Sequence, residues 1–477
     1  MTDLTQFDAD IAGIIGAAHV LTAQADMAGY VGDWRGRYHG QARAVIRPAS
    51  TAEVSEVVKA AHRHGVRIVP QSGNTGLVGG AVPDDAKRSV VLSLSRMRTV
   101  REVDLDNNSV TVEAGLVLAE LRDLAASHDR LFPVNLGAVG SAQVGGLVST
   151  NAGGTEALRY GTMRDQVLGL EVVLADGRVL DGLRGLRKDN SGYDLKHLFI
   201  GTEGTLGIVT AAVLKLWPRR MASSTALVAL PHPEAATRLL SAFYARIGNR
   251  VESFELINRS QIETVQKHCA EITSPMPLTH DWYTLIEISD PARLMDLNAA
   301  MVEVLGNQFE DGTVSDAVIA QDLTQAARIW EIRHSISEAN KDEGFTVSND
   351  TSVPVSRQPA FLARVTADLI RDYPQALCNH CGHMGDGNVH VIVVFPHGTY
   401  DYDSCDDLGF AVNRIVHMAA LEFGGSIAAE HGIGRMHVRR LAETKSPVAL
   451  DLMRQIKRTL DPEGTLNPGK ILARYEG

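Results

Sequence analysis

The chain has 477 residues, a length that favours two or three domains rather than one. Hydrophobic residues make up 44% and charged residues 22%, as in a folded globular enzyme, so the composition excludes a disordered or fibrous chain. Acidic residues outnumber basic ones by 57 to 46, and this balance argues against a general binder of nucleic acid or of an anionic membrane.

The first third of the chain alternates short apolar runs with an amphipathic helical pattern, which predicts an α/β arrangement. The helix begins after Ser50, where S-x-x-E up to Glu53 forms a capping box, and it ends near Gly65. Two hairpins are expected further on, because Asn107-Asn108 and Asp176-Gly177 each separate two apolar runs. Strands are expected at residues 42–47, 66–70 and 89–95.

A change in pattern near Trp217 marks a domain boundary. The glycine clusters stop there and longer helical patterns begin, one of them at residues 230–248. The region from about 220 to 375 reads as α+β, and the density of motifs rises again from Cys378 onward.

The N-terminal segment is acidic and has no basic region of the kind that opens a signal or transit peptide. No apolar run approaches the ~18 residues of a membrane helix. We therefore expect a cytoplasmic protein. The cysteines are too few and too unevenly placed for a disulfide framework. They are Cys269, Cys378, Cys381 and Cys405.

Two uncharged segments concentrate the glycines, residues 70–80 and residues 137–154. Glycine lets backbone N–H groups approach a ligand closely, and consecutive N–H groups suit a pyrophosphate. Two tight turns in a β-rich domain are the alternative. The Rossmann and P-loop spacings are absent, which disfavours ordinary NAD and NTP sites. Neutral side chains in these segments add donors: Ser72, Asn74, Thr75, Ser141, Ser149, Thr150 and Asn151.

Four motifs in order identify a family resemblance. PQSGNTGLVGG (70–80), NLGAVGSAQVGGLVSTNAGG (135–154), GTEGTLGIVT (201–210) and LNPGK (466–470) together resemble the FAD-binding domain of vanillyl-alcohol-oxidase type flavoproteins. The resemblance covers nearly the whole chain from Tyr38 onward. It implies an α+β protein in which a two-subdomain FAD-binding domain is joined to a substrate domain with an antiparallel sheet.

The resemblance also implies where the domains and the cofactor lie. The FAD-binding domain takes residues 1–219 with its core at 38–217, the substrate domain takes 220–444 and carries the metal, and 445–477 returns to the first domain. The FAD would be cradled by 71–77, 136–151, Gly204–Val209 and Asn467. The individual residues expected at the FAD are Pro70, Ser72, Gly73, Asn74, Thr75, Gly76, Leu77, Leu136, Gly137, Ser141, Gly145, Gly146, Ser149, Thr150, Asn151, Gly204, Gly207, Ile208, Val209 and Asn467.

The first loop has no residue that could link a flavin covalently. Many relatives attach the flavin to a histidine, tyrosine or cysteine, and residues 70–80 contain none of these. We therefore expect non-covalent FAD.

The richest chemical stretches are CNHCGHMGDGNVHVIVVF (378–395) and IAAEHGIGR (427–435). Histidine nitrogens with a carboxylate oxygen are a usual ligand set for Zn²⁺ or a similar ion, and three protein ligands leave a position for substrate. Most single residues here have simpler interpretations: Cys378 and Cys381 as small buried thiols, Asp386 as a turn residue. Structural histidines are expected at His380, His397 and His437.

GHMGDGNVH and AAEHGIG resemble the D-2-hydroxyacid dehydrogenase branch, which includes the D-2-hydroxyglutarate and D-lactate dehydrogenases. The resemblance implies a divalent metal, zinc before manganese or iron, on His383, His390 and Glu430, with His431 as the catalytic base. The chemistry is consistent with these roles. A metal lowers the pKa of the substrate hydroxyl, and a neutral histidine can take its proton while the hydride moves to the flavin.

Three further residues are expected at the substrate. WEIRHSISEAN (330–340) supplies Arg333 on a helix, and relatives use the matching arginine on a substrate carboxylate. Ser337 lies four residues on, so the same helix face should carry it. Ser348 departs from the pattern, because the hydroxyglutarate enzymes typically have a lysine there. The departure puts the contact to a distal carboxylate in doubt and favours neutral-tailed acids such as D-lactate.

Two other functions stay open. A flavoenzyme for another alcohol, such as a sugar lactone, would lack the histidine pair and the EHG motif. A flavin- and metal-binding subunit of a glycolate-oxidising complex would need partners for turnover. The chain carries no iron–sulfur or haem motif, so electrons must pass to a separate acceptor, such as electron-transfer flavoprotein or a quinone. The sequence leaves the oligomeric state open, a homodimer included.

Overall fold

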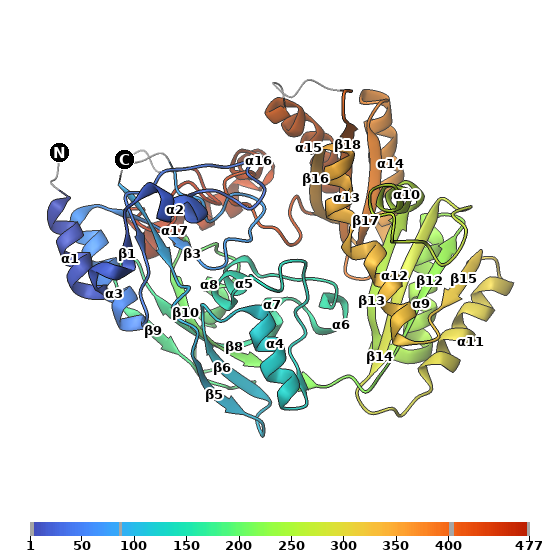
Figure 1. Ribbon diagram of the computed structural model, residues 1–477, viewed down its shortest axis with the longest axis horizontal. Coiled ribbons are helices and arrows are strands. Elements are labelled where there is room, and N and C mark those ends of the chain that lie inside the picture. Colours follow the sequence, from blue (N-terminus) through green and yellow to red (C-terminus); the bar gives the residue numbers. More distant parts are fainter. Residues whose placement is uncertain (1–3, 85–87, 400–404, 475–477) are drawn as a thin grey trace. The chain divides into compact units, whose positions relative to one another are not determined.

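The computed structural model describes residues 4–84, 88–399 and 405–474, and the chain folds into two compact units (Figure 1). Each unit is built from separated stretches of the chain. Unit 1 consists of Met1–Gly154, Gly161–Pro218 and Glu430–Gly477, and unit 2 consists of Thr155–Tyr160 and Arg219–Ala429.

The long segment of unit 2 begins after Pro218, where the glycine clusters end, and this boundary is one residue from the expected position. The return to unit 1 differs more, because it falls at Glu430 rather than at residue 445. The reason is backbone bonding: the N–H groups of Ile433 and Gly434 donate to Glu203 of unit 1, at 2.7 and 2.8 Å. The structure also assigns a short internal segment, Thr155–Tyr160, to unit 2.

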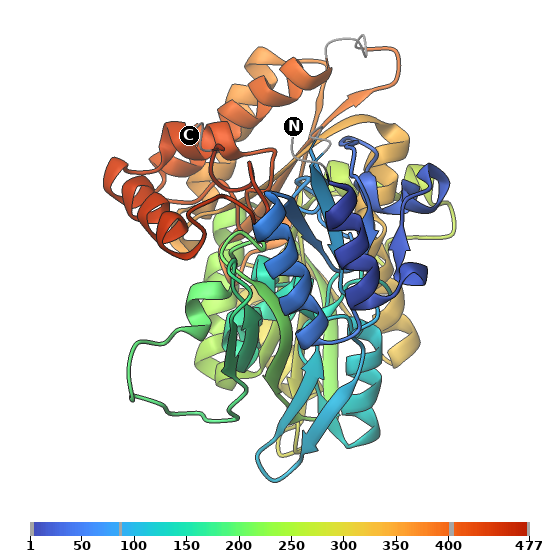
Figure 2. The ribbon, with the colours of Figure 1, turned by 90° about the vertical axis from the view of Figure 1, so that its left-hand side faces the viewer.

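Unit 1 contains a small sheet of order β1-β2-β4-β3, in which β4 pairs in parallel with β2 and β3. Helices α1 (Thr5–Ile15) and α3 (Thr51–His64) lie side by side against it (Figure 2) and share its apolar core. The strands are β1 (Val20–Leu21), β2 (Val45–Ile46), β3 (Arg67–Gln71) and β4 (Ser89–Ser93).

The elements expected in this region form with small differences. The strand expected at 42–47 is only β2, two residues long. Helix α3 begins as predicted, with Ser50 Oγ accepting from the N–H of Glu53 at 3.2 Å. The Glu53 carboxylate accepts instead from the N–H of Ala49 at 2.7 Å, one residue earlier than in a capping box. Gly65 ends the helix with φ of 61°.

A second sheet of unit 1 is antiparallel, with the order β5-β6-β10-β8-β9. Both predicted hairpins belong to it, and their turns take positive φ: 50° at Asn108 and 83° at Gly177. Helices α4 (Leu118–Ser127) and α5 (Val144–Thr150) pack on its apolar face. The strands are β5 (Val100–Asp104), β6 (Ser109–Glu113), β8 (Val167–Val173), β9 (Val179–Gly182) and β10 (Ile208–Lys215).

Unit 2 is a three-layer sandwich around a seven-stranded antiparallel sheet of order β15-β12-β14-β13-β17-β18-β16 (Figure 1). Alternate residues of β12 enter two different cores, Val228 on one face and Leu227 on the other. The strands are β12 (Ala222–Leu230), β13 (Val251–Asn258), β14 (Trp282–Asp290), β15 (Asp316–Ile319), β16 (Gly344–Ser352), β17 (Leu377–His383) and β18 (Asn388–Pro396).

Each face of this sheet is covered by its own helices. Face A carries α9 (Pro233–Ile247), α11 (Leu297–Glu310), α14 (Gln358–Asp372) and α15 (Cys405–Glu422). Face B carries α10 (Arg259–His268), α12 (Leu323–His334) and α13 (Ile336–Glu343). This arrangement confirms the predicted α+β domain with an antiparallel sheet. No helix in the described ranges is long and apolar enough to cross a membrane.

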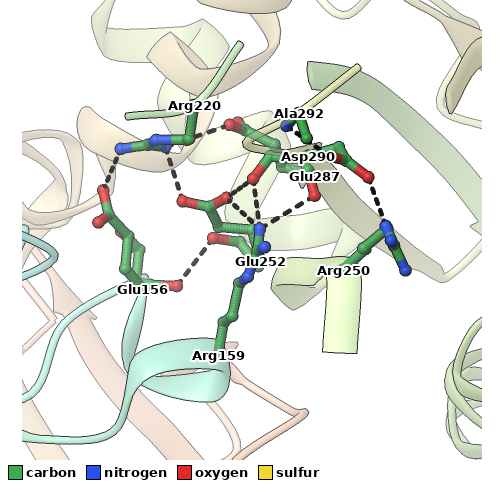
Figure 3. A network of polar contacts seen from close by, with 11 residues as sticks. Glu156, Arg159, Arg220, Arg250, Glu252, Glu287, Asp290 and Ala292 are labelled. Atoms are coloured by element: carbon green, nitrogen blue, oxygen red, sulfur yellow. Dashed lines mark hydrogen bonds and ion pairs between the residues drawn. The ribbon is translucent and has the colours of Figure 1, made fainter. Parts of the chain in front are cut away.

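The crossover segments of unit 2 are tied to its sheet by a buried ionic network (Figure 3). Arg220 bonds to Glu156 at 3.0 Å and pairs with Glu252 at 2.8 Å, while Arg159 pairs with Glu252 at 3.2 Å. Glu252 is 1% exposed, so its charge requires these partners. Burial, followed by the neighbouring Glu252 carboxylate, raises the pKa of Glu287 to about 7.

The C-terminal segment is held in unit 1 by a buried ion pair at the end of α17 (Pro447–Leu460). Lys457 donates to the carbonyls of Thr205 and Leu466 at 2.7 and 3.0 Å and pairs with Asp461. Asp461 also accepts from the N–H groups of Thr465 and Leu466, at 2.9 and 2.8 Å, and is 1% exposed. The pair therefore fixes the turn that leads to Asn467.

Replacing Asp461 tests this anchor. Asp461→Ala leaves the Lys457 charge buried without its partner, and we expect the free energy of unfolding to fall by about 3–5 kcal/mol. Glu463→Ala is the control, because that side chain is 58% exposed. Urea denaturation of both variants measures the effect. Equal stability of the two variants would show that the pair does not anchor the segment.

Candidate active site

The first glycine loop follows β3 and lies against the second loop. A Cβ on Gly73 would collide with the carbonyl oxygen of Ser141, so only glycine allows this approach. Gly76 and Gly137 instead have nothing within 4 Å of the Cβ position. Among the described residues, none accepts a hydrogen bond from the backbone N–H groups of residues 72–80. The loop therefore combines tight backbone packing with N–H groups suited to an anionic ligand.

The four motifs close into a ring of contacts within unit 1. The N–H of Glu203 donates to the carbonyl of Ser149 at 2.7 Å, which joins the third motif to the second. Asn467 Nδ2 donates to the carbonyls of Glu203 and Gly80, at 2.6 and 3.0 Å, which joins the fourth motif to the third and the first. Segments far apart in the sequence therefore form one cradle.

Three neutral side chains expected as ligand donors make hydrogen bonds within the protein. Asn74 Nδ2 donates to the carbonyl of Gly32 at 2.8 Å, and Thr150 Oγ1 donates to that of Gly146 at 2.9 Å. Asn151 Oδ1 accepts from Thr162 Oγ1 at 3.0 Å. These bonds hold the loops in place, and the role of the three side chains at a ligand stays a prediction.

Sequence reasoning missed Glu203 as an individual residue. This side chain is 9% exposed, has φ of 51°, and accepts from the N–H groups of Ile433 and Gly434. Burial raises its pKa to about 7, although those N–H groups favour the charged form. Burial likewise lowers the pKa of Lys470 to about 8. The available signal was the single acidic residue inside an otherwise uncharged glycine motif.

Glu203 holds the turn that carries the EHG motif. Within unit 1, Glu430 Oε1 accepts from the N–H of Gly154 at 2.8 Å, at the end of the second glycine loop. A Cβ on the neighbouring Gly153 would come within 2.9 Å of that carboxylate oxygen. Glu430 is thus bonded to the end of the second glycine loop, and His431 follows it directly in the chain.

In unit 2, the β17–β18 hairpin brings His383 and His390 together. Cys381 lies opposite His390 in the strand pairing, and His383 is two residues further on, so both rings are on face B. Their centroids are 5.6 Å apart and their planes meet at 80°. Asp386 makes the connecting turn, as predicted, and accepts from the N–H of Asn388 at 3.0 Å.

A carboxylate stands beside Nδ1 of each ring. His383 Nδ1 bonds to Glu255, and His390 Nδ1 is 3.6 Å from Asp350. Burial alone would raise the pKa of Glu255, but the charges and hydrogen bonds of His383 and Arg333 outweigh it and hold this pKa well below its usual range. The hydrogen bond to Glu255 leaves Nε2 of His383 as the ring atom suited to a metal.

The three expected substrate residues have different surroundings. Arg333 Nε donates to Glu255 Oε2 at 2.6 Å. The spacing predicted that Arg333 and Ser337 share one helix. Helix α12 instead ends at His334 and α13 begins at Ile336, so the two residues lie on different helices. Ser348 lies opposite Ile392 in the sheet and two residues before Asp350, which puts it on face B.

The remaining candidates have structural surroundings. His380 is 2% exposed and its Nε2 bonds to Thr366 Oγ1 at 2.8 Å. Burial lowers its pKa to about 4, which suits a neutral core histidine better than a base. Cys378 packs against the core of face A and Cys381 belongs to that of face B, so they do not form a redox pair. The Cys405 side chain lies outside the described residues.

Comparison with known proteins defines the class. The family model for the FAD binding domain matches residues 42–182, and that for the C-terminal domain of FAD linked oxidases matches residues 220–471. Two solved structures share the fold at low identity. The p-cresol methylhydroxylase structure has a TM-score of 0.77, 18% identity, and covers 98% of this chain and 97% of its own. The structure of a 4-ethylphenol oxidase from Gulosibacter chungangensis has a TM-score of 0.74 and 20% identity, and the match covers 99% of this chain and 98% of that one.

The curated relatives are closer in sequence. A D-2-hydroxyglutarate dehydrogenase of Xanthomonas citri pv. viticola is 38% identical over 96% of this chain and 95% of its own length. A probable mitochondrial D-2-hydroxyglutarate dehydrogenase of Oryza sativa subsp. indica is 39% identical over 92% of this chain and 77% of its own. A D-2-hydroxyglutarate–pyruvate transhydrogenase of Saccharomyces cerevisiae is 33% identical over 96% of this chain and 92% of its own length.

The chain therefore belongs to the FAD-linked oxidase family, and it is an FAD-dependent oxidoreductase. Its 33–39% identity to the relatives just named confirms the resemblance read from the glycine motifs, GHMGDGNVH and AAEHGIG. The glycine cradle of unit 1 fits FAD, because it offers backbone N–H groups beside glycines with open space at the Cβ position.

The cradle predicts unequal effects of two glycine substitutions. Gly73→Ala forces the first loop away from Ser141, so we expect reduced FAD content and lower thermal stability of the flavin-free protein. Gly76→Ala meets no protein atom within 4 Å, so it should leave that stability unchanged and affect FAD binding alone. Absorbance of bound flavin and thermal unfolding of the stripped proteins measure both. Equal stability of the two flavin-free variants would refute the packing argument.

Proposed function

We propose that the protein oxidises a D-2-hydroxy acid to the 2-oxo acid with FAD and a divalent metal. The observation that carries the proposal is the histidine pair on face B, with a carboxylate beside Nδ1 of each ring. Relatives named D-2-hydroxyglutarate dehydrogenases support the substrate class. The stereochemistry is taken from those relatives.

The donor set fits a metal. His383, His390 and Glu430 would hold the ion, zinc before manganese or iron, since two imidazoles and a carboxylate leave a position for substrate. The chain path supports Glu430 as the third ligand. The N–H of Ala429 donates to Asp350 at 3.2 Å, and Asp350 stands beside His390, so Glu430 follows a residue anchored at the pair. When bound, the metal supplies a Lewis acid that lowers the pKa of the substrate hydroxyl.

The residues of the chain would then perform the remaining steps. His431 takes the hydroxyl proton on its imidazole, and Glu203 keeps the turn that carries His431 in place. Bound FAD supplies the acceptor for the hydride that leaves C2. The FAD is non-covalent in this proposal, because residues 70–80 contain no histidine, tyrosine or cysteine.

The preferred acid depends on what meets its far end. Arg333, on α12, would grip a substrate carboxylate with its guanidinium group. Ser337 would also contact the substrate. A serine at 348 recovers only part of the energy of a lysine facing a second carboxylate, and Asp350 would repel a dianion. We therefore propose a broad preference that includes D-lactate and larger neutral-tailed acids, with D-2-hydroxyglutarate as the alternative.

The electrons would leave to a separate acceptor, electron-transfer flavoprotein or a quinone. A cytoplasmic location stays a prediction, and several relatives are named mitochondrial. A homodimer stays open as well. The competing function, a flavin- and metal-binding subunit of a glycolate-oxidising complex, predicts no turnover by the isolated chain.

Dye reduction by the isolated chain tests the proposal. D-2-hydroxy acids should support reduction of the dye and their L-enantiomers should not.

Removing the metal tests its role in turnover. Chelation should abolish turnover while FAD stays bound, and adding back zinc, manganese or iron should restore it. Full activity of protein shown to be metal-free by elemental analysis would refute the metal part of the proposal.

A variant of His431 tests the catalytic base. His431→Asn should lower kcat by ~10²–10⁴ and keep the metal. His232→Asn, which changes an exposed histidine, is the control.

Position 348 is tested by adding the missing charge. Ser348→Lys should raise kcat/KM for D-2-hydroxyglutarate relative to D-lactate by roughly tenfold or more, because a charge-assisted contact contributes about 1.5–3 kcal/mol. Ser348→Ala is the control and should not shift the ratio toward the dianion. A wild type that already favours D-2-hydroxyglutarate by a hundredfold would mean that Ser348 does not set the preference.

A further inference from the structure

Glu255 is a carboxylate in the middle of the seven-stranded sheet with 0% of its side chain exposed. A buried carboxylate is stable only when it is paired and hydrogen-bonded. Here Oε2 accepts from Arg333 Nε at 2.6 Å, and Oε1 bonds to Nδ1 of His383. Glu255 thus stands between an arginine on α12 and a histidine on β17.

The sheet itself sets the contact between the carboxylate and the histidine. Glu255 of β13 lies directly opposite His383 of β17 in the antiparallel pairing. Directly opposed residues on one face have their Cβ atoms close together, so this contact does not depend on long flexible side chains. His383 is 4% exposed, so water competes little for its Nδ1.

Such a contact selects one form of the imidazole. A carboxylate at Nδ1 accepts a hydrogen bond, which keeps the proton on Nδ1 and leaves the Nε2 lone pair for a metal. We propose that Glu255 is a positioning residue that fixes the ring and the tautomer of His383 for metal binding, and that Arg333 supports this role by balancing the buried charge of Glu255. The inference rests on the proposed metal site and adds two residues to its support.

The second histidine is held less tightly. Asp350 is 3.6 Å from His390 Nδ1, beyond hydrogen-bond range, and it accepts from Asn388 Nδ2 at 2.7 Å and from the N–H of Ala429 at 3.2 Å. Asp350 is therefore shared among several donors. Of the two carboxylates, Glu255 is the one whose geometry can dictate a tautomer.

Glu255→Gln is the informative change because it keeps the shape and alters the donors. Arg333 would attract the amide oxygen, which turns the amide NH₂ toward His383 Nδ1 and makes that nitrogen an acceptor. The proton would then move to Nε2, the atom needed for the metal. Outer-sphere partners of this kind typically change metal affinity by about 10–100-fold.

The experiment uses the flavin-loaded full chain. Zinc affinity is measured by competition with a chelator of known affinity, and the His383 tautomer by long-range ¹⁵N–¹H spectra of histidine-labelled, metal-free protein. Glu255→Gln should weaken zinc binding by about 10–100-fold and shift the His383 proton from Nδ1 to Nε2, with flavin content unchanged. Glu287→Gln is the matched control: its carboxylate also lies on the sheet and contacts α12 through Trp330 Nε1. Glu287→Gln should change neither the zinc affinity nor the tautomer of His383.

Arg333→Met separates the two roles of the arginine. If Arg333→Met weakens zinc binding in the absence of substrate, the role through Glu255 is supported. If zinc binding is unchanged and only the KM for the substrate rises, that role is overturned. For Glu255, unchanged zinc affinity and an unchanged tautomer in Glu255→Gln overturn the proposal. If the wild type binds no metal, the proposed metal site fails. The tautomer of metal-free protein still decides whether Glu255 positions His383.

Discussion

The antiparallel pairing of β13, β17, β18 and β16 is the constraint on which the chemistry of unit 2 depends. It puts Glu255 opposite His383, Asp350 opposite His390, and all four side chains on face B of the sheet. A slip of one residue in any of these pairings would turn its side chains to face A, where they would meet an apolar core. Stability of the sheet and geometry of the histidine pair therefore have the same origin.

In unit 1, a few buried polar groups hold the glycine loops and the neighbouring turns in place. Glu203 holds the turn after the EHG motif, and Asn467 closes the ring of glycine loops. The Lys457–Asp461 pair fixes the segment that delivers Asn467. Each group satisfies backbone donors or acceptors that would otherwise be buried without partners, so the loops can stay rich in glycine and still be ordered.

Local patterns in the sequence predicted what depends on local physics. The capping position of Ser50, both hairpin turns and the two glycine loops follow from turn chemistry and local composition, whereas the antiparallel sheet of unit 2 was expected from the family resemblance. The histidine pair was expected from the family motif GHMGDGNVH, and the hairpin with its turn at Asp386 places both histidines on one face of the sheet. The break at Ser335 was not expected, since the helical pattern runs across it without glycine or proline.

Contacts set by long-range pairing were out of reach of such patterns. Glu255 and His383 are 128 residues apart, and Glu203 and Gly434 are 231 apart. Nothing near Glu255 in the sequence distinguishes it from other strand carboxylates. Asn74 bonds to the carbonyl of Gly32, and Asn151 accepts from the N–H of Arg164; both bonds depend on where the chain returns, so local patterns do not reveal them.

If the proposed site is correct, hydride transfer from a D-2-hydroxy acid to the bound flavin should require the metal. Anaerobic rapid mixing of the metal-loaded and the metal-free enzyme with D-lactate, followed by flavin absorbance, tests it in a single turnover. We expect fast bleaching of the flavin only with metal, slower bleaching when C2 of the acid carries deuterium, and no bleaching with L-lactate. Bleaching at the same rate without metal, or equally with L-lactate, would contradict it.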